Sequence, residues 1–300
     1  MKIFFTGIRN FHFLNGIIAW FRERGCVAER EEDADVIWIE WMTTEAVPII
    51  DRNRGKRICM RCHLYEIDRP ESVRQIPFND VSVLFFVSRA PHQRFEQRYP
   101  EFAVKTQVIP NAVDTRKFGY ALRRECGYTL GMLGRIFPKK DQAAVLLRLR
   151  SIDKRWRLVV QGSAPRKYRR YLAWLKLLRW CLRLGDRVDF LPHTEEPLRF
   201  YRAVDAVVSN SRDESFHMSV AEGMACGCWP VIRDWDGARD IYPSAQIYSN
   251  PREMRGILLR YERMTAAERE AATRDMRAFV EQRYGIPVVG ERIEAALAAL

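Results

Sequence analysis

The residues best suited to chemistry lie in the second half of the chain, just after short apolar runs that read as strands. The run Tyr128–Gly134 is followed by Arg135 and Lys140. Two cations behind a strand suit a diphosphate, because arginine binds phosphate in a bidentate manner and lysine acts as a point charge. Gly134 lets the backbone pass close to such a ligand. Basic surface loops are common, so this pattern alone is weak evidence.

Two glutamates lie on either side of the start of a predicted helix. Glu214 lies in the loop before the helix, which begins near Met218, and Glu222 lies one turn inside it. The free N–H groups at a helix start bind phosphate, and carboxylates accept hydrogen bonds from sugar hydroxyls. The alternative interpretation is two ordinary glutamates beside a helix. Gly162, which follows the apolar run 156–161, marks a further tight turn above the sheet.

Strand-like runs alternate with helical patterns along the whole chain, which predicts parallel sheets with helices on both faces. The expected strands lie within residues 1–7, 34–41, 56–62, 81–88, 106–110, 128–134, 156–162, 187–192, 205–211 and 228–232. Helical patterns cover residues 17–24, 142–149, 166–184, a stretch from 218, 266–284 and 287–300. Two such series predict two doubly wound domains, joined near Asp114–Gly127. Such sheets bind ligands beyond the carboxyl ends of their strands, so we expect the ligand between the domains.

Composition predicts a globular protein with a polyanionic partner. With 300 residues, 47% of them hydrophobic, the chain can form two cores, which excludes disordered and low-complexity classes. The 50 Lys and Arg exceed the 38 Asp and Glu, and a net charge of +12 favours nucleic acid, an anionic membrane or a phosphorylated ligand. No run is long enough to span a membrane and no export signal is evident, so we predict a cytoplasmic protein with free cysteines.

Three short patterns that could hold haem or a metal ion are interpreted as structural. Cys59–His63 matches the C-x-x-C-H pattern of haem attachment, but it reads as a buried strand running into a loop. The D-x-D triplets at residues 33–35 and 234–236 could hold a divalent cation on a diphosphate, yet such triplets arise by chance in a chain of this charge. We therefore predict no metal site.

The stretch Arg166–Leu184 combines an apolar stripe with many cations. The stripe at helical spacing consists of Tyr168, Tyr171, Leu172, Leu175, Leu178 and Leu182, and the opposite edge carries Arg169, Lys176 and Arg183. We interpret it as a helix packed on the sheet with a solvated basic face. The alternative is an interfacial helix that touches anionic lipid. We expect no nucleic acid, because no recognised nucleic-acid-binding motif accompanies the charge.

The order of these motifs resembles the GT-B glycosyltransferases of family 4, which transfer nucleotide-activated sugars with retention of configuration. The matching segments are residues 109–114 (IPNAVD) with Phe118, Gly134 and Arg135 with Lys140, Gly162, Tyr201 with Asp205, Glu214 to Glu222, and residues 225–231 (ACGCWPV). The resemblance is clear over about residues 81–241 and loose over the first 80. The order of these segments, rather than any one of them, carries the resemblance.

The resemblance implies an α/β protein with the GT-B fold, in which two Rossmann-like doubly wound domains face each other across a cleft. The acceptor-side domain is expected over residues 1–116, which is short for the family. The nucleotide-sugar-binding domain is expected over residues 117–282, and a C-terminal helix over 283–300 could pack back on the first domain.

Residue roles follow from the resemblance position by position. Arg135 and Lys140 would hold the donor diphosphate and neutralise charge on the leaving group. Glu214 would bind hydroxyls of the donor sugar, and Glu222 those of the ribose. The remaining donor-side residues are Gly134 and Gly162 and the segment whose backbone amides meet the sugar and proximal phosphate: Phe216, His217, Met218 and Ser219.

In the first half, the segment around His63 resembles the strand and loop that present a histidine to the sugar, with Arg61 and Glu66 beside it. The alternative for His63 is a loop histidine whose ring is hydrogen-bonded by backbone groups. Three departures from the family pattern concern glycine: Ser215, His217 and Ala112 stand where the family usually has it. The double glycine that many members carry is not evident near Gly16, so acceptor chemistry cannot be carried over.

The resemblance implies a retaining, metal-independent hexosyltransferase that needs a nucleoside-diphosphate sugar and no cofactor. Its expected partner is an unknown glycan or lipid-linked acceptor. The net charge of +12 leads to a separate hypothesis, that Arg166–Leu184 touches an anionic membrane surface at the inner face of the cell membrane. We expect a role in bacterial-type glycan, glycolipid or cell-surface polysaccharide assembly. The alternatives are a nucleotide-sugar epimerase on the same fold and a basic protein that binds nucleic acid or membrane. The sequence does not specify the donor base, the sugar, the acceptor or the oligomeric state.

Overall fold

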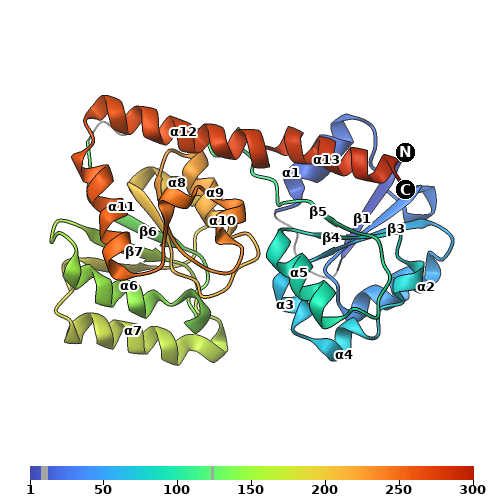
Figure 1. The fold of residues 1–300 in the computed structure, drawn as a ribbon, viewed down its shortest axis with the longest axis horizontal. Helices are drawn as coiled ribbons and strands as arrows, with labels where there is room; N and C mark the ends of the chain where they lie inside the picture. Colours follow the sequence, from blue (N-terminus) through green and yellow to red (C-terminus); the bar gives the residue numbers. More distant parts are fainter. Residues whose placement is uncertain (8–12, 123–124) are drawn as a thin grey trace. The chain divides into compact units, whose positions relative to one another are not determined.

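The computed structural model describes residues 1–7, 13–122 and 125–300, which form two compact units (Figure 1). The first unit consists of residues 1–113 and 283–300, and the second of residues 114–282. Two sequence-based predictions fall partly outside the described residues. The expected joint at Asp114–Gly127 includes residues 123 and 124, and the N-terminal stretch inspected for an export signal includes residues 8–12.

The first unit is built on a sheet of parallel strands in the order β1 to β5. These strands are β1 (Ile3–Gly7), β2 (Val36–Glu40), β3 (Arg57–Cys62), β4 (Val83–Phe86) and β5 (Thr106–Val108). Each lies within an apolar run that predicted it. The central strands β2 and β4 are buried along their whole length, as expected of a parallel sheet covered on both faces.

The winding of this sheet reverses at β1. The chain leaves β1 through helix α1 (Asn15–Glu23) and returns at Val27, which pairs with Ile3. Ile3 forms this pairing with its own N–H and C=O groups. On the other side of the strand, the carbonyl of Lys2 accepts a hydrogen bond from the N–H of Val36 at 3.1 Å. Val27 and β2 therefore lie on opposite sides of β1. This arrangement makes the first unit doubly wound, as predicted.

Helices cover both faces of the first sheet. One face carries α1 and α13 (Ile286–Ala298), where Ile17 and Ile293 pack with Trp38. The helices on the other face are α2 (Val47–Arg52), α3 (Leu64–Ile67), α4 (Pro70–Val73) and α5 (Arg89–Arg98). Helix α13 packs closely on α1, because a Cβ atom on Gly290 would lie 2.7 Å from the Trp20 ring.

The second unit holds a parallel sheet whose order is β11-β10-β9-β6-β7-β8. Its strands are β6 (Thr129–Leu133), β7 (Arg157–Gln161), β8 (Val188–Leu191), β9 (Ala206–Ser209), β10 (Trp229–Arg233) and β11 (Ile247–Tyr248). Counted from β6, this is the strand order of the nucleotide-binding Rossmann fold. The order reverses between β6 and β9, which is the point where such sheets bind their ligands.

The helices of the second unit are α6 (Gln142–Arg148), α7 (Arg169–Cys181), α8 (Pro197–Ala203), α9 (Met218–Ala225), α10 (Ala238–Ile241), α11 (Pro251–Arg263) and α12 (Ala266–Tyr284). The last two residues of α12 belong to the first unit. The predicted bounds of α12 and the predicted start of α9 are confirmed. Leu175 on the inner side of α7 is buried in the core beside α6, as its apolar stripe predicts.

None of the helices in residues 1–7, 13–122 and 125–300 is long and apolar enough to cross a membrane. All seven cysteines lie within these ranges and are free thiols, as predicted. Cys59 and Cys62 of the C-x-x-C-H pattern are buried in β3, which agrees with the structural interpretation of that pattern.

Candidate functional site

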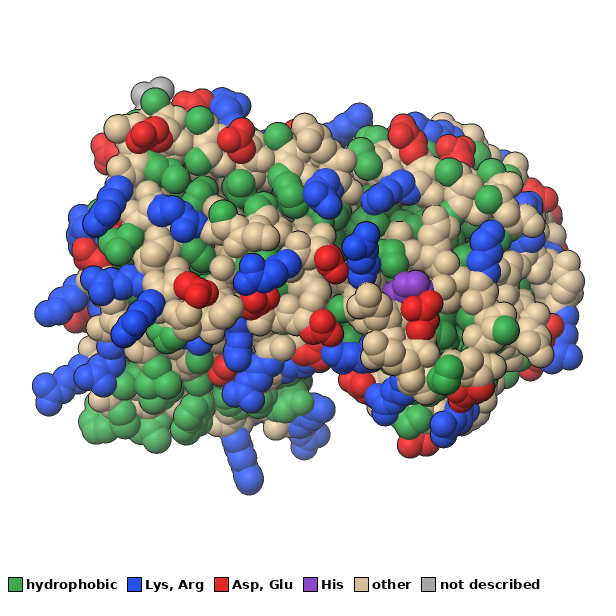
Figure 2. All heavy atoms as spheres, in the orientation of Figure 1, with side chains coloured by type: hydrophobic (Ala, Val, Ile, Leu, Met, Phe, Trp, Pro, Cys, Tyr) green, Lys and Arg blue, Asp and Glu red, His purple; other side chains and the backbone are tan. Residues whose placement is uncertain are grey.

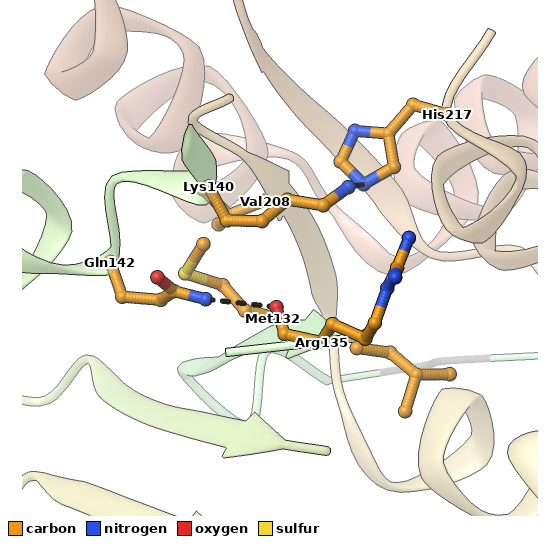
Figure 3. A pocket seen from close by; sticks show the side chains of 8 residues that line it. Met132, Arg135, Lys140, Gln142, Val208 and His217 are labelled. Carbon is orange, nitrogen blue, oxygen red and sulfur yellow. Dashed lines mark hydrogen bonds between the residues drawn. The ribbon is translucent and has the colours of Figure 1, made fainter. Parts of the chain in front are cut away.

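A small pocket lies at the carboxyl ends of β6 and β9, where the strand order of the second sheet reverses. Its lining consists of Met132, Leu133, Gly134, Arg135, Lys140, Gln142, Val208 and His217. Figure 3 shows the Arg135 guanidinium, the Lys140 ammonium and the His217 ring directed toward the same region. Four residues predicted from the sequence, Gly134, Arg135, Lys140 and His217, therefore meet here.

The loop after β6 is supported from behind by Gly162. A Cβ atom at Gly162 would lie 1.8 Å from the Gly134 carbonyl oxygen, so no other residue fits without displacing the loop. The N–H of Gly134 donates to Gln161 O at 3.0 Å, and that of Ile136 donates to Ser163 O at 2.9 Å. Gly162 thus fixes the backbone that carries Arg135.

The backbone after Lys140 is held by Asp141, which sequence reasoning did not single out. Asp141 begins α6 in the left-handed conformation, with φ of 49° and ψ of 44°. Its carboxylate accepts from Arg233 at 2.9 Å and from Arg212 at 3.3 Å. Its carbonyl accepts from Asn210 at 2.8 Å. These contacts from the β9 and β10 ends fix the turn that presents Lys140.

Lys140, Glu214 and His217 form a connected polar cluster. Lys140 Nζ donates to Glu214 Oε1 at 2.5 Å and lies 3.2 Å from His217 Nε2. Because an ammonium has no lone pair, Nε2 must accept and the ring proton resides on Nδ1. Nδ1 lies 2.5 Å from Ser209 Oγ, to which it donates. Lys140 therefore uses two of its three donors within the cluster, and no other described residue accepts from the third.

The electrostatics of this cluster fix its charge. Burial alone would raise the pKa of Glu214, but the Lys140 ammonium lowers it to about 2. Burial, and then the charge of Lys140, lower the pKa of His217 to about 3. At neutral pH the cluster thus contains a carboxylate, an ammonium and a neutral imidazole. The cationic charge that Lys140 brings is balanced by Glu214, so Arg135 supplies the excess positive charge of the pocket.

Acidification is expected to destabilise the second unit because of His217. The unfolded chain protonates this imidazole near its ordinary pKa of 6.5, whereas folded His217 stays neutral down to about pH 3. The unfolded state therefore binds one more proton in this window, and the free energy of unfolding falls by up to about 1.4 kcal/mol per pH unit. Melting curves of wild type and His217→Gly between about pH 7 and pH 4 measure this slope, which should be smaller in the variant.

The control for this measurement is His193→Gly, since the His193 side chain is 60% exposed beside Glu195. It should keep the wild-type slope. Equal slopes for wild type and His217→Gly would contradict the assignment of a buried neutral imidazole.

The start of α9 lies beside this cluster. His217 precedes the helix with φ of 65° and ψ of 67°, a left-handed conformation that favours glycine. The Tyr242 hydroxyl lies 2.9 Å from Phe216 O and 3.0 Å from His217 O, and it anchors this turn. Phe216 itself is buried. The first N–H groups of α9, on Met218 and Ser219, have no partner inside the helix, and N–H groups in this position can bind phosphate.

Glu222 lies further along α9 and is not among the residues that line the pocket. Its Oε2 accepts from the Tyr201 hydroxyl at 2.6 Å, and burial raises its pKa. Asp205, which follows Tyr201 in the sequence motif, accepts from the N–H groups of Gly127 and Thr129 at 3.1 and 2.9 Å. The tyrosine of this motif thus holds Glu222, and the aspartate fixes the entry to β6.

In the first unit, His63 belongs to a buried cluster at the ends of β2 and β3. Glu40 accepts from Arg61 Nε at 2.9 Å and from Trp38 Nε1 at 3.0 Å, and it lies 2.7 Å from His63 Nε2. Burial would raise the pKa of Glu40, but Arg61 and His63 hold it below its ordinary value. Burial lowers the pKa of His63. The Glu66 carboxylate accepts from the His63 N–H. The roles of His63, Arg61 and Glu66 toward a sugar stay predictions.

The carboxylates of the D-x-D triplets are engaged by neighbouring groups. Asp33 pairs with Arg30 at 2.9 Å, and Asp234 with Arg239 at 2.7 Å. Asp35 accepts from the Lys2 N–H at 2.7 Å. Within the part of the chain that the structure describes, no group of three or more His, Cys, Asp or Glu side chains could hold a metal ion.

Comparison with known proteins gives a family match to the second unit. Residues 118–252 match the model of the family described as glycosyl transferases group 1. This range contains the residues that line the pocket and the whole of α9. His63 and its cluster lie outside it.

Solved structures match over 93–100% of the chain. The HepE protein of Anabaena, in complex with UDP and glucose, matches over 100% of both chains with a TM-score of 0.77 and 17% identity. Sucrose-phosphate synthase from Thermosynechococcus elongatus gives a TM-score of 0.73 at 14% identity, over 94% of this chain and 75% of that one. A TarM variant from S. aureus gives 0.70 at 15% identity, over 93% of this chain and 57% of its own.

These structural similarities establish the fold, which is GT-B with two Rossmann-like units, as predicted. The family match makes residues 118–252 a glycosyltransferase domain, and the protein is a glycosyltransferase.

Proposed function

We propose that this protein transfers a sugar from a nucleoside-diphosphate sugar to an acceptor, with retention of anomeric configuration and without a metal ion, like the family 4 enzymes it resembles. The observation that carries the proposal is the meeting of Arg135 and Lys140 in one pocket at the reversal point of the second sheet. This is the position at which such sheets bind nucleotides. The adjacent start of α9 adds N–H groups suited to phosphate.

The donor binds with its diphosphate between these groups. The Arg135 guanidinium and the third donor of Lys140 hold phosphate oxygens, and the Met218 and Ser219 amides hold the proximal phosphate. Glu214 remains charged at neutral pH and accepts from sugar hydroxyls through lone pairs that Lys140 leaves free. Glu222 accepts from the ribose hydroxyls at the other end of the donor, in addition to Tyr201.

Catalysis in this proposal is electrostatic. As the bond from the sugar to the diphosphate breaks, negative charge grows on the leaving phosphate, and Arg135, Lys140 and the α9 N-terminus are already oriented toward it. The acceptor hydroxyl attacks on the face that the diphosphate leaves, and the leaving phosphate oxygen takes the hydroxyl proton. No protein nucleophile is required, and configuration is retained.

The complexes of HepE with UDP, with UDP and glucose and with UDP-glucose make UDP-glucose the first donor to test on this chain. The acceptor we propose is a glycan or a lipid-linked glycan, in cell-surface polysaccharide or glycolipid assembly at the inner face of a cell membrane. The excess of cations in the chain suits an acceptor that carries phosphate or other anionic groups.

The test is release of nucleoside diphosphate from UDP-, GDP- and ADP-sugars, each with and without EDTA. We expect slow hydrolysis of one donor, unchanged by EDTA because protein cations take the place of a metal ion. Once an acceptor is found, NMR of the product anomer tests retention. Release that vanishes with EDTA would overturn the metal-independent mechanism. If no donor releases nucleoside diphosphate and no nucleotide shifts the melting temperature, the proposal of donor binding is overturned.

A further inference from the structure

Helix α7 exposes large apolar side chains on the side that faces away from its sheet. Leu175 is fully buried, whereas Trp180 is 76% exposed, Leu177 54% and Trp174 46%. At 3.6 residues per turn, Leu177 and Trp180 lie at the centre of the outer face and Trp174 lies at its edge. Figure 2 shows hydrophobic side chains gathered at the lower left, where α7 lies in Figure 1.

The same helix and the turn before it carry positive charge only. From Arg166 to Leu184 there are seven cations and no acidic residue: Arg166, Lys167, Arg169, Arg170, Lys176, Arg179 and Arg183. None of these seven forms an ion pair with a described residue. In contrast, Lys139, Arg155 and Arg157, in the same unit, pair with Asp213, Asp153 and Asp189. The charge of α7 is therefore not balanced within the described protein.

We propose that the outer face of α7 is a docking surface for an anionic lipid bilayer. Tryptophan and leucine gain free energy at the boundary between headgroups and acyl chains, and unpaired Lys and Arg gain it from anionic headgroups. The long basic side chains beside Leu177 and Trp180 reach the headgroups while their stems stay with the apolar strip. This surface, defined by Trp174, Leu177, Trp180 and the seven cations, has both components on α7 and the turns that flank it. Of the cations, Arg179 also donates to Gly185 O at 2.5 Å.

The charge pattern disfavours two other occupants. A second copy of the chain would bring seven unbalanced cations against another seven, which repel each other in an apolar contact. A nucleic acid would use the cations, but the exposed Leu177 and its neighbours would remain in water. A bilayer satisfies both the charge and the apolar area.

The turn before α7 contacts the loop that carries two of the pocket residues, Arg135 and Lys140. Tyr168, just before α7, stacks on Phe137 at 5.6 Å between ring centroids, and Phe137 lies in the loop between Arg135 and Lys140. A docked α7 therefore keeps this loop near the lipid headgroups. Docking itself does not depend on the proposed reaction, so failure of the donor test leaves the docking inference intact.

The test is co-sedimentation of the full chain with vesicles of phosphatidylcholine alone or mixed with phosphatidylglycerol. Wild type should bind the mixed vesicles and not the neutral ones. Trp174→Ser/Trp180→Ser should lower the partition coefficient about tenfold or more, and Lys176→Glu/Arg183→Glu should lower it to a similar extent. Donor hydrolysis and melting temperature, measured in parallel, show that each variant is folded.

The matched control is Arg252→Glu/Arg255→Glu on exposed positions of α11, which changes the net charge by the same amount. It should keep most of the vesicle binding. Equal loss in this control would show that total charge alone drives binding and would overturn the assignment to α7. Unchanged vesicle binding of the tryptophan variant would also overturn the assignment. Two further results would overturn it in favour of another occupant. One is a wild-type dimer that is lost in the tryptophan variant, and the other is tighter binding of the wild type to duplex DNA than to vesicles.

Discussion

Replacing Lys140 with alanine is expected to lower the rate of donor turnover about 10²–10³-fold, the usual cost of removing one donor aimed at charge that develops in a transition state. Lys140 is held in the pocket by two contacts, to Glu214 at 2.5 Å and to His217 at 3.2 Å, and its turn is fixed by Asp141. The ammonium therefore needs no reorientation when the phosphate leaves. Steady-state kinetics with the donor found in the nucleotide-sugar panel measure the loss.

The control lies one residue away. Lys139 is partly exposed and pairs with Asp213 at 3.1 Å, and it does not line the pocket. Lys139→Ala removes the same charge from the same loop and should retain turnover within about threefold of wild type. Arg135→Ala should resemble Lys140→Ala. Near-normal turnover in both pocket variants would refute the site.

Lys140→Ala also leaves the Glu214 carboxylate without its cation, so a change in folding has to be separated from a change in catalysis. Lys140→Met keeps the length and the apolar stem of the side chain. If the melting temperatures of both variants stay within a few degrees of wild type while turnover is lost, the loss of turnover results from removal of the charge. A collapse of the melting temperature in both would show that the ion pair is structural.

The fold could be predicted because the alternation of apolar runs with amphipathic stretches can be recognised from the sequence alone. All ten predicted strands are present, since parallel strands buried on both faces require continuous apolar residues. Strand β11 was not predicted, nor were the helices α2 to α5, α8 and α11. A signal for α11 was available: Asn250 caps it by accepting from Arg252 and Glu253, and Pro251 occupies its first turn.

The pocket could be predicted only in part, because its supporting contacts join residues far apart in the chain. Gly134, Arg135 and Lys140 could be found since they follow one strand directly. Asp141 could not, because its partners Arg233 and Arg212 come from other strand ends.

His217 illustrates the same limit. Its departure from the family glycine is visible in the sequence, and the left-handed φ explains why glycine is usual there. The sequence could not predict that the imidazole turns toward Lys140 and Ser209. Because the strained backbone occurs together with these contacts, we expect the ring itself to serve the site.

Replacing Glu40 with alanine is expected to destabilise the first unit by about 3–5 kcal/mol, because it leaves the Arg61 guanidinium buried without a counter-charge. Both side chains are almost fully shielded from water, at 0% and 1% exposure. Trp38 Nε1 and His63 Nε2 lose their acceptor in the same step. Urea unfolding of the full chain measures the change. Glu32→Ala, at a carboxylate 66% exposed beside Arg30, is the control and should cost less than about 0.5 kcal/mol.

A double variant then separates stability from chemistry. Glu40→Leu/Arg61→Met removes both charges, so it should recover part of the lost free energy, with the remainder reflecting the unpaired Trp38 and His63. If donor turnover stays low while stability returns, Glu40 acts by holding His63 in position for the sugar. If turnover returns with stability, the cluster serves only the fold of the first unit. A Glu40→Ala loss below about 1 kcal/mol would contradict the buried ion pair itself.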